Sequence, residues 1–324
     1  MPEPVMQRLV HRITPSNNSA VEVELGPFPL SFLSIDIIRT QPAANANLTA
    51  LDMVSFISRV HVHARGISLW DATGEESFII GQTLLTKTPP FKKSQLGATN
   101  YRHIANIIVP FSRQPMSPVS GLPAVGRGEA ILRLEFGTVP SGTLISVHAF
   151  GWREHKPEWT LRCVRVSANI SATGDNDIPL AIAGSILGFV FEEGAPYWNS
   201  GTAILDNVRL LVGGVEDTLN SLNFEGLKAL QAVTADYLLD DIEHFHVENT
   251  GGTYSQNAST LTEQHNQYTQ KYTFVLLDEL FDPDAMVTIP PGVDVRLRVN
   301  ASATGALYIF PVELFILPER KEAG

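Results

Sequence analysis

Polar and apolar residues alternate with a period of two along much of the chain. In SRVHVHAR, which starts at Ser58, Val60 and Val62 fall on one face, and the histidines fall on the other. The segments AILRLEF (130–136) and VDVRLRV (293–299) alternate in the same way. This period is typical of half-buried antiparallel strands, and turns such as VPSG and IPPG separate them. The pattern predicts an all-β protein.

Two stretches have helical spacing within this β-rich pattern. EESFIIGQTLLTK (75–87) is the shorter one, and residues 216–244 form the longer one. In the longer stretch Leu219, Leu222 and Leu227 recur at intervals that place them near one face of a helix. The sequence therefore predicts one short helix in each half of the chain.

The chain contains an internal repeat. When it is shifted against itself by 148 residues, Ile57 lies on Leu205 and Gly66 lies on Gly214. Three more blocks recur in the same order. Phe28 lies on Ile178 at a shift of 150 residues, and Phe111 lies on Phe281 at a shift of 170 residues. The strand pair from Ile131 lies on the strand pair from Val295 at a shift of about 163 residues. Colinear blocks of this kind indicate two copies of one unit.

We therefore expect two tandem jelly-roll β-sandwiches, each with a short helix. The expected divisions are an N-terminal arm (1–27), a first jelly roll (28–155), a second jelly roll (160–318) with a long polar insertion at about 236–271, and a C-terminal tail (319–324). A polar insertion on a rigid sandwich is expected to form an exposed loop or a short hairpin.

The repeated sandwich architecture resembles the double jelly-roll major capsid proteins of tailless icosahedral phages and viruses that enclose an internal membrane. The resemblance covers about residues 28–318 and rests on the repeated blocks. It implies a homotrimer whose six sandwiches form a pseudo-hexagonal capsomer, with neighbouring capsomers and penton or minor capsid proteins as partners. It implies no catalytic residue and no cofactor, and a location in the virion.

The H-x-H pair of His61 and His63 suggests a different function. On a strand the two imidazoles lie on one face, about 7 Å apart, as in half of a cupin metal site. The inward face, however, is taken by the valines, so the histidines point outward beside Arg59 and Arg65. Two guanidinium groups repel a divalent metal, and we expect no metal here.

A second H-x-H pair, His244 and His246, has better companions for metal binding because Asp240, Asp241 and Glu243 precede it. Acid-rich loops are more often simply solvated, and we assign no metal-binding residue. A bicupin-like metalloenzyme remains one alternative function. A carbohydrate-binding or carbohydrate-active tandem sandwich is another, with the four tryptophans as a sugar-binding surface: Trp70, Trp152, Trp159 and Trp198.

Charge and composition limit the remaining possibilities. The net charge of −11 argues against sequence-specific binding to nucleic acid. The single cysteine, Cys163, lies in a predicted strand, and there is no G-x-S-x-G motif. The longest apolar run, from Ile178, is too short to span a bilayer, so we expect synthesis as a soluble protein in the host cytoplasm. The basic, amphipathic MQRLVHRI in the arm is a candidate for peripheral contact with a lipid membrane.

Overall fold

The chain folds into two compact units in the computed structural model. The structure describes residues 4–7, 12–42, 48, 50–85, 91–96, 100–115, 117, 119–152, 156–193, 204–216, 222–223, 247–250, 253–256, 271–277 and 286–318. Among these, the first unit consists of the residues up to Arg165 and those from Val312 onward. The second unit lies between them in the sequence, from Val166 to Pro311.

The first unit consists mainly of β-strands. Its elements are β1 (Pro4–Gln7), β2 (Arg12–Ile13), β3 (Ala20–Glu24), β4 (Leu30–Pro42), α1 (Ala50–Val54), β5 (Ile57–Ala64), β6 (Ile67–Ala72), α2 (Gly74–Leu85), β7 (Phe91–Leu96), β8 (Asn100–Pro110), β9 (Ala130–Phe136), β10 (Thr143–Trp152) and β11 (Thr160–Val164). The end of β22 (Gly305–Phe315) also belongs to this unit.

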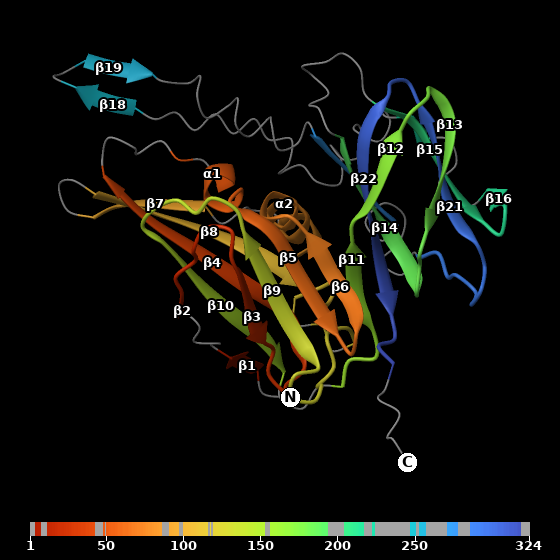
Figure 1. Cartoon of the computed structure of the whole chain (residues 1–324), viewed down its shortest axis with the longest axis horizontal. Coiled ribbons are helices and arrows are strands. Elements are labelled where there is room, and N and C mark those ends of the chain that lie inside the picture. The colour runs from red at the N-terminus through yellow and green to blue at the C-terminus, as the bar shows by residue number, and fades with distance from the viewer. Residues whose placement is uncertain are drawn as a thin grey trace. The chain divides into compact units, whose positions relative to one another are not determined.

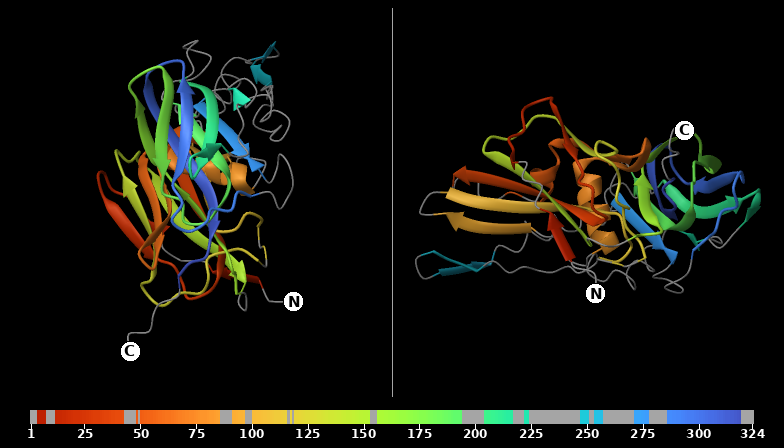
Figure 2. Two further views of the ribbon diagram at one scale, coloured as in Figure 1. Left: turned by 90° about the vertical axis from the view of Figure 1, so that its right-hand side faces the viewer. Right: turned by 90° about the horizontal axis from the view of Figure 1, so that it is seen from below.

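These strands form two sheets that face each other. One sheet has the order β1-β10-β4-β8-β7, with β2 also paired to β10. The other runs β3-β9-β5-β6-β11, and the last residues of β22 pair with β11. Figure 1 shows β3, β9, β5 and β6 in front of the layer that contains β4, β8 and β10, and Figure 2 shows the same strands from two further sides. Two sheets that face each other in this strand order form a jelly roll, and β11 joins its sheet by parallel pairing with β6.

The predicted alternation explains how the first unit builds its core. Ile35 and Ile37 of β4, and Val60 and Val62 of β5, have no exposed surface. Because alternate residues of a strand point to opposite faces, each strand sends its aliphatic residues between the sheets and its polar residues outward. Burying this apolar surface is the main favourable contribution to folding.

Helix α2 confirms the helix predicted at 75–87 as far as Leu85. It begins with a capping box, in which the Glu76 carboxylate accepts from the backbone N–H of Thr73 and the Thr73 hydroxyl accepts from the N–H of Glu76. Gly81 lies against the carbonyl oxygen of Ile108 in β8 so closely that a Cβ atom would come within 1.8 Å of it. The side chain of Gln82 donates to the Asn106 carbonyl of the same strand. The helix thus covers a stretch of β8 at the sheet edge.

The second unit has the same plan. Its elements are β12 (Val166–Ile170), β13 (Gly174–Leu180), β14 (Ser185–Glu193), β15 (Leu205–Val212), β16 (Val215–Glu216), β17 (Leu222–Asn223), β18 (Val247–Thr250), β19 (Thr253–Gln256), β20 (Tyr272–Leu276), β21 (Val295–Ala301) and the first part of β22. One sheet runs β13-β21-β15-β16 and the other runs β20-β14-β22, with β12 on β22. Their inner faces pack into one aliphatic and aromatic core.

The strand pairing confirms the internal repeat. The order β3-β9-β5-β6 of the first unit corresponds to β13-β21-β15-β16 of the second, and β10-β4-β8 corresponds to β22-β14-β20. Strands β5 and β15 begin at Ile57 and Leu205, which are the residues that the 148-residue shift aligns. The turns that follow them also match, because Gly66 and Gly214 both have φ of 80°. The fold is therefore two tandem jelly rolls, as predicted.

Two of the aligned blocks need correction. Ile178 lies opposite Leu297 in the second unit, as Val23 lies opposite Leu132 in the first, so the alignment of Ile178 with Phe28 is wrong. The shared Pro-Leu dipeptide misled the alignment, since these residues end one strand in β13 but begin another at β4. In the last block the strand register matches Leu132 to Leu297, a shift of 165 residues, so the alignment of Ile131 with Val295 is displaced by one residue. The aligned Phe281 lies outside the described residues.

The predicted N-terminal arm (1–27) differs from the structure. Strands β1 and β2 pair with β10, and β3 pairs with β9, so these segments are parts of the first jelly roll. The unit boundaries differ from 155, 160 and 318 as well. The first unit extends to Arg165 because β11 pairs with β6. It also includes the residues from Val312 onward, because the end of β22 pairs with β11.

The predicted helix at 216–244 is wrong where the structure describes it. Leu222–Asn223 forms β17, paired with β15, and Glu216 ends β16. The rest of that stretch lies outside the described residues, as do residues 319–324 of the predicted tail. Within the predicted insertion at about 236–271, β18 and β19 form an antiparallel hairpin, which is one of the two forms expected there.

Candidate interaction surface

His61 and His63 lie on the outer face of the sheet β3-β9-β5-β6. Val60, Val62 and Ala64 of the same strand have no exposed surface, while both histidines are half-buried. The prediction that the histidines point away from the core is therefore confirmed. Their rings lie 5.4 Å apart between centroids.

The surroundings of His61 favour its neutral form. Its Nε2 lies 3.1 Å from the Ser68 hydroxyl of β6. Burial lowers the pKa of His61 below its ordinary value, and the nearby cations Arg59 and Arg133 lower it further, against the opposing effect of Asp71. Among the described residues, no group of three His, Cys, Asp or Glu side chains has metal-site geometry.

A row of ion pairs crosses the same face. Arg59 of β5 donates two hydrogen bonds of 2.7 Å to the Asp71 carboxylate of β6. On its other side Arg59 lies 3.7 Å from Glu135 of β9. Hydrogen bonding to Asp71 raises the pKa of Arg59 above its ordinary value. The two-point contact fixes the plane of the guanidinium group.

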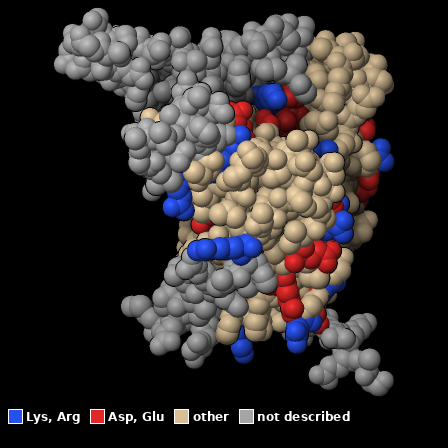
Figure 3. Space-filling model, turned by 60° about the vertical axis from the view of Figure 1, so that its left-hand side comes forward, with Lys and Arg blue, Asp and Glu red and all other residues tan. Residues whose placement is uncertain are grey.

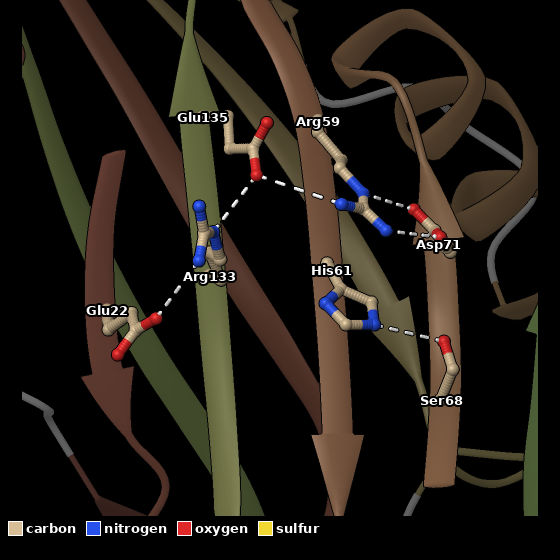
Figure 4. Close-up of polar contacts among 7 residues, drawn as sticks. All are labelled: Glu22, Arg59, His61, Ser68, Asp71, Arg133 and Glu135. Atoms are coloured by element: carbon tan, nitrogen blue, oxygen red, sulfur yellow. Dashed lines mark hydrogen bonds and ion pairs between the residues drawn. The ribbon is translucent and has the colours of Figure 1, made fainter. Parts of the chain in front are cut away.

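Arg133 of β9 extends this row to the sheet edge. Its Nε donates to Glu135 over 2.9 Å, and its Nη1 lies 3.4 Å from Glu22 of β3. Figure 4 shows the five side chains side by side on four neighbouring strands. We call this row the charge ladder: Asp71, Arg59, Glu135, Arg133 and Glu22. Its charges alternate in sign from one end to the other.

The turn after β5 is held by polar contacts. Arg65 has φ of 50°, which is unusual for a residue other than glycine. Its side chain lies 3.3 Å from the Glu129 carboxylate and donates to the carbonyl oxygen of Pro318 over 2.8 Å. These bonds hold the left-handed turn in place. In the second unit the corresponding residue is Gly213, which adopts φ of 60° without a side chain.

The second unit repeats one part of the ladder. Arg298 of β21 donates two hydrogen bonds to Asp177 of β13, at 2.6 and 2.8 Å. By strand register this pair corresponds to Arg133 and Glu22 of the first unit. Here Arg209 stands opposite Arg298 in β15, so the alternation of charge is interrupted.

Sequence analysis missed a polar cluster on the outer face of the other sheet. His148 of β10 lies 3.1 Å from the Asp36 carboxylate of β4, and Ser34 donates to the same carboxylate over 2.7 Å. Asn106 of β8 also donates to Asp36. The available signal was an aspartate two residues after a serine in the mostly apolar segment SFLSIDII. Each of these four groups has a partner within the cluster, which favours a structural role.

Two partly buried ion pairs, also missed by sequence analysis, lie around β11. Arg162 pairs with Glu313 of β22, and Arg165 lies 2.8 Å from Glu76 of α2. Cys163 lies between the two arginines in β11 and is buried, and burial together with Glu313 raises the pKa of its thiol. A thiol that stays protonated is a poor nucleophile. The ion pairs therefore hold β11 in the sheet rather than forming a reactive site.

Some of the other predicted candidates fall within the described residues and some do not. His244, His246 and Trp198 lie outside the described residues. Trp70 is buried and donates from its indole to Ser77 over 2.9 Å. The structure describes no helix that is long and apolar enough to cross a membrane. On the face drawn in Figure 3, acidic and basic side chains of the described residues lie beside each other, flanking a broad uncharged area.

Solved structures with the same fold span nearly the whole chain. The major capsid protein P2 from Bacteriophage PM2 is 12% identical, with a TM-score of 0.61, and the match covers 98% of this chain and 99% of that protein. The fold is the double jelly roll. The major capsid protein of Sulfolobus Turreted Icosahedral Virus is 10% identical, with a TM-score of 0.66 and 97% coverage of both chains.

A third match is to VP54 of PBCV-1, at 7% identity, with a TM-score of 0.56 and coverage of 97% of this chain and 94% of that one. No protein-family profile matches the chain, and no curated protein matches its sequence. The similarity is thus one of fold, spread over both jelly rolls, at sequence identities too low to align side chains on the surface.

Proposed function

We propose that this chain is the major capsid protein of an icosahedral virus that encloses an internal membrane. The supporting observation is the tandem repeat of one jelly roll, in the same strand order, over nearly the full length of two solved major capsid proteins. The function of such a chain is assembly rather than catalysis. Its rigid sandwiches supply the shape, and their outer faces supply weak contacts that add up over many copies.

The proposed assembly unit is a homotrimer. Three chains bring six similar jelly rolls together, so a three-fold particle acquires a pseudo-hexagonal outline that tiles a shell. Neighbouring capsomers and penton or minor capsid proteins are the proposed partners. The mature location is the virion, after soluble synthesis in the host cytoplasm. Peripheral contact between the segment at Met6–Ile13 and the membrane also stays a prediction, and its ends pair with β10.

The alternative functions receive less support from the described residues. A bicupin-like site needs ligands between the sheets, but in β5 that space is filled by Val60, Val62 and Ala64. Trp70 cannot contribute to a sugar-binding surface of tryptophans, because it is buried in the first unit.

The mass of the purified protein in solution tests the proposal. The chain has a mass of 35.4 kDa, and multi-angle light scattering is expected to give three times that value, or larger assemblies. A monomer at all concentrations that binds a panel of oligosaccharides would contradict the capsid function. Stoichiometric metal in the same sample, measured by elemental analysis, would favour the bicupin alternative instead.

A further inference from the structure

The charge ladder on the first unit is exposed to solvent. Its side chains range from 27% exposed at Asp71 to 56% at Glu22. We propose that this face binds the same face of a second copy of the chain, ladder against ladder. The inference rests on the proposed capsid function, because it identifies a two-fold contact through which chains of neighbouring trimers associate.

The order of charges makes the ladder complementary to itself. Carboxylate, guanidinium, carboxylate, guanidinium and carboxylate follow one another across β6, β5, β9 and β3. When a second ladder faces the first and is displaced by one step, each arginine meets a carboxylate of the other copy. Because hydrogen bonds within each chain already hold the side chains, little further ordering is needed on binding.

Other partners fit this face less well. Three carboxylates outnumber two guanidinium groups in the ladder, so a nucleic acid or an anionic lipid surface would be repelled. The neutral His61, close to Arg59 and Arg133, adds no positive charge to change this balance. A protein surface with the same alternation satisfies both signs, and a second copy provides that surface.

Folding stability explains one part of the ladder. The two-point Arg59–Asp71 contact is a geometry that stabilises the fold, whereas the more exposed single contact of Arg133 with Glu22 contributes little. The corresponding face of the second unit also carries ion pairs, Asp177–Arg298 and Asp294–Arg296, but there the neighbouring Arg209 and Arg298 break the alternation. That face therefore serves as an internal comparison for the ladder.

The test compares two matched variants of the full chain. The ladder variant carries Arg59→Gln, Asp71→Asn, Arg133→Gln and Glu135→Gln. The control carries Asp177→Asn, Asp294→Asn, Arg296→Gln and Arg298→Gln on the second unit. Each variant removes two positive and two negative charges, so the net charge of the protein is unchanged.

Sedimentation velocity at about 50 mM and about 500 mM NaCl measures self-association, since added salt screens exposed charges. We expect wild type and control to associate more strongly at low salt, and the ladder variant to associate about tenfold more weakly than both under that condition. Thermal unfolding of each protein verifies that it is folded. If the ladder variant does not fold, the swap E22R/R133E retains an internal ion pair and reverses two charges of the ladder.

The possible results separate this inference from the proposed function. A wild-type protein that stays monomeric contradicts both. A wild-type trimer whose association is unaffected by the ladder substitutions, or by salt, overturns the ladder contact and leaves the capsid function standing. Equal weakening by the ladder and control variants also overturns it, because the effect would then not belong to the first unit.

Discussion

His61 is surrounded by groups from three strands. Arg59 and His63 flank it on β5, Ser68 and Asp71 face it from β6, and Arg133 faces it from β9. Burial and the two arginines make the imidazolium form unfavourable, and the single carboxylate Asp71 is already engaged by Arg59. The folded protein therefore keeps this ring neutral at a pH where an unfolded chain would begin to protonate it.

This environment predicts a specific dependence of stability on pH. Because the pKa of His61 is lowered in the folded state, the unfolded chain takes up a proton first as the pH falls through about 6.5. Stability contributed by the neutral ring is present above that pH and is lost below it. Replacing His61 with Gln removes this contribution, so the unfolding temperature of wild type should fall more between about pH 7.5 and about pH 5.5 than that of the variant.

Thermal unfolding of both proteins by circular dichroism at the two pH values checks this prediction. The two proteins share every other titrating group. The difference between their changes in unfolding temperature with pH therefore measures the contribution of His61. Parallel slopes would show that the ring does not resist protonation in the folded state.

For single residues, the sequence predicts which face of a strand a side chain lies on better than it predicts which other side chains it contacts. The alternation in SRVHVHAR was sufficient to place Val60 and Val62 inward and the histidines outward. The alternation did not predict the charge ladder, because Arg59, Glu135 and Glu22 come from strands that are far apart in the chain. Only the pairing register of these strands brings the three residues together. The Asp36–His148 pair was missed for the same reason.

Helix α2 shows how one element depends on a single residue type. Its close approach to β8 at Gly81 leaves no space for a side chain, because the contact is with backbone atoms of Ile108 that cannot rotate away. The helix covers the edge of this part of β8, where Gln82 donates a hydrogen bond to the backbone carbonyl oxygen of Asn106. The helix and the sheet therefore form one packed layer.

Replacing Gly81 with Ala tests this packing. The new methyl group would overlap the Ile108 carbonyl, so we expect a loss of about 1–3 kcal/mol in the free energy of unfolding. Gly137→Ala is the matched control, because a Cβ atom there meets nothing closer than 3.7 Å. Chemical denaturation of the two variants and wild type gives the comparison, and equal stability of all three would show that α2 lies further from β8.

For helices and strands, the sequence predicted the elements with strong periodicity and did not predict the shortest ones. The strands β5, β9 and β21 follow directly from alternation, and α2 follows from its helical spacing. Strands β1 and β2 contain four and two residues, too few to show a period, so they were assigned to an arm. Leu222–Asn223 pairs with β15 despite helical spacing, because tertiary contacts override local preference.

The whole molecule is a duplication, and this explains both what could be predicted and what could not. Two copies of one fold leave colinear traces in the core positions, since inward residues are constrained by packing. The connection between the units leaves no such trace. Its position near Arg165 and Val312 depends on β11 and the end of β22, which pair with each other across a long separation in sequence.

Electron microscopy of the purified full-length protein tests the central claim most directly. The account predicts three-fold particles containing three chains, with six similar lobes and a pseudo-hexagonal outline in projection. Single-chain particles at every concentration would contradict it.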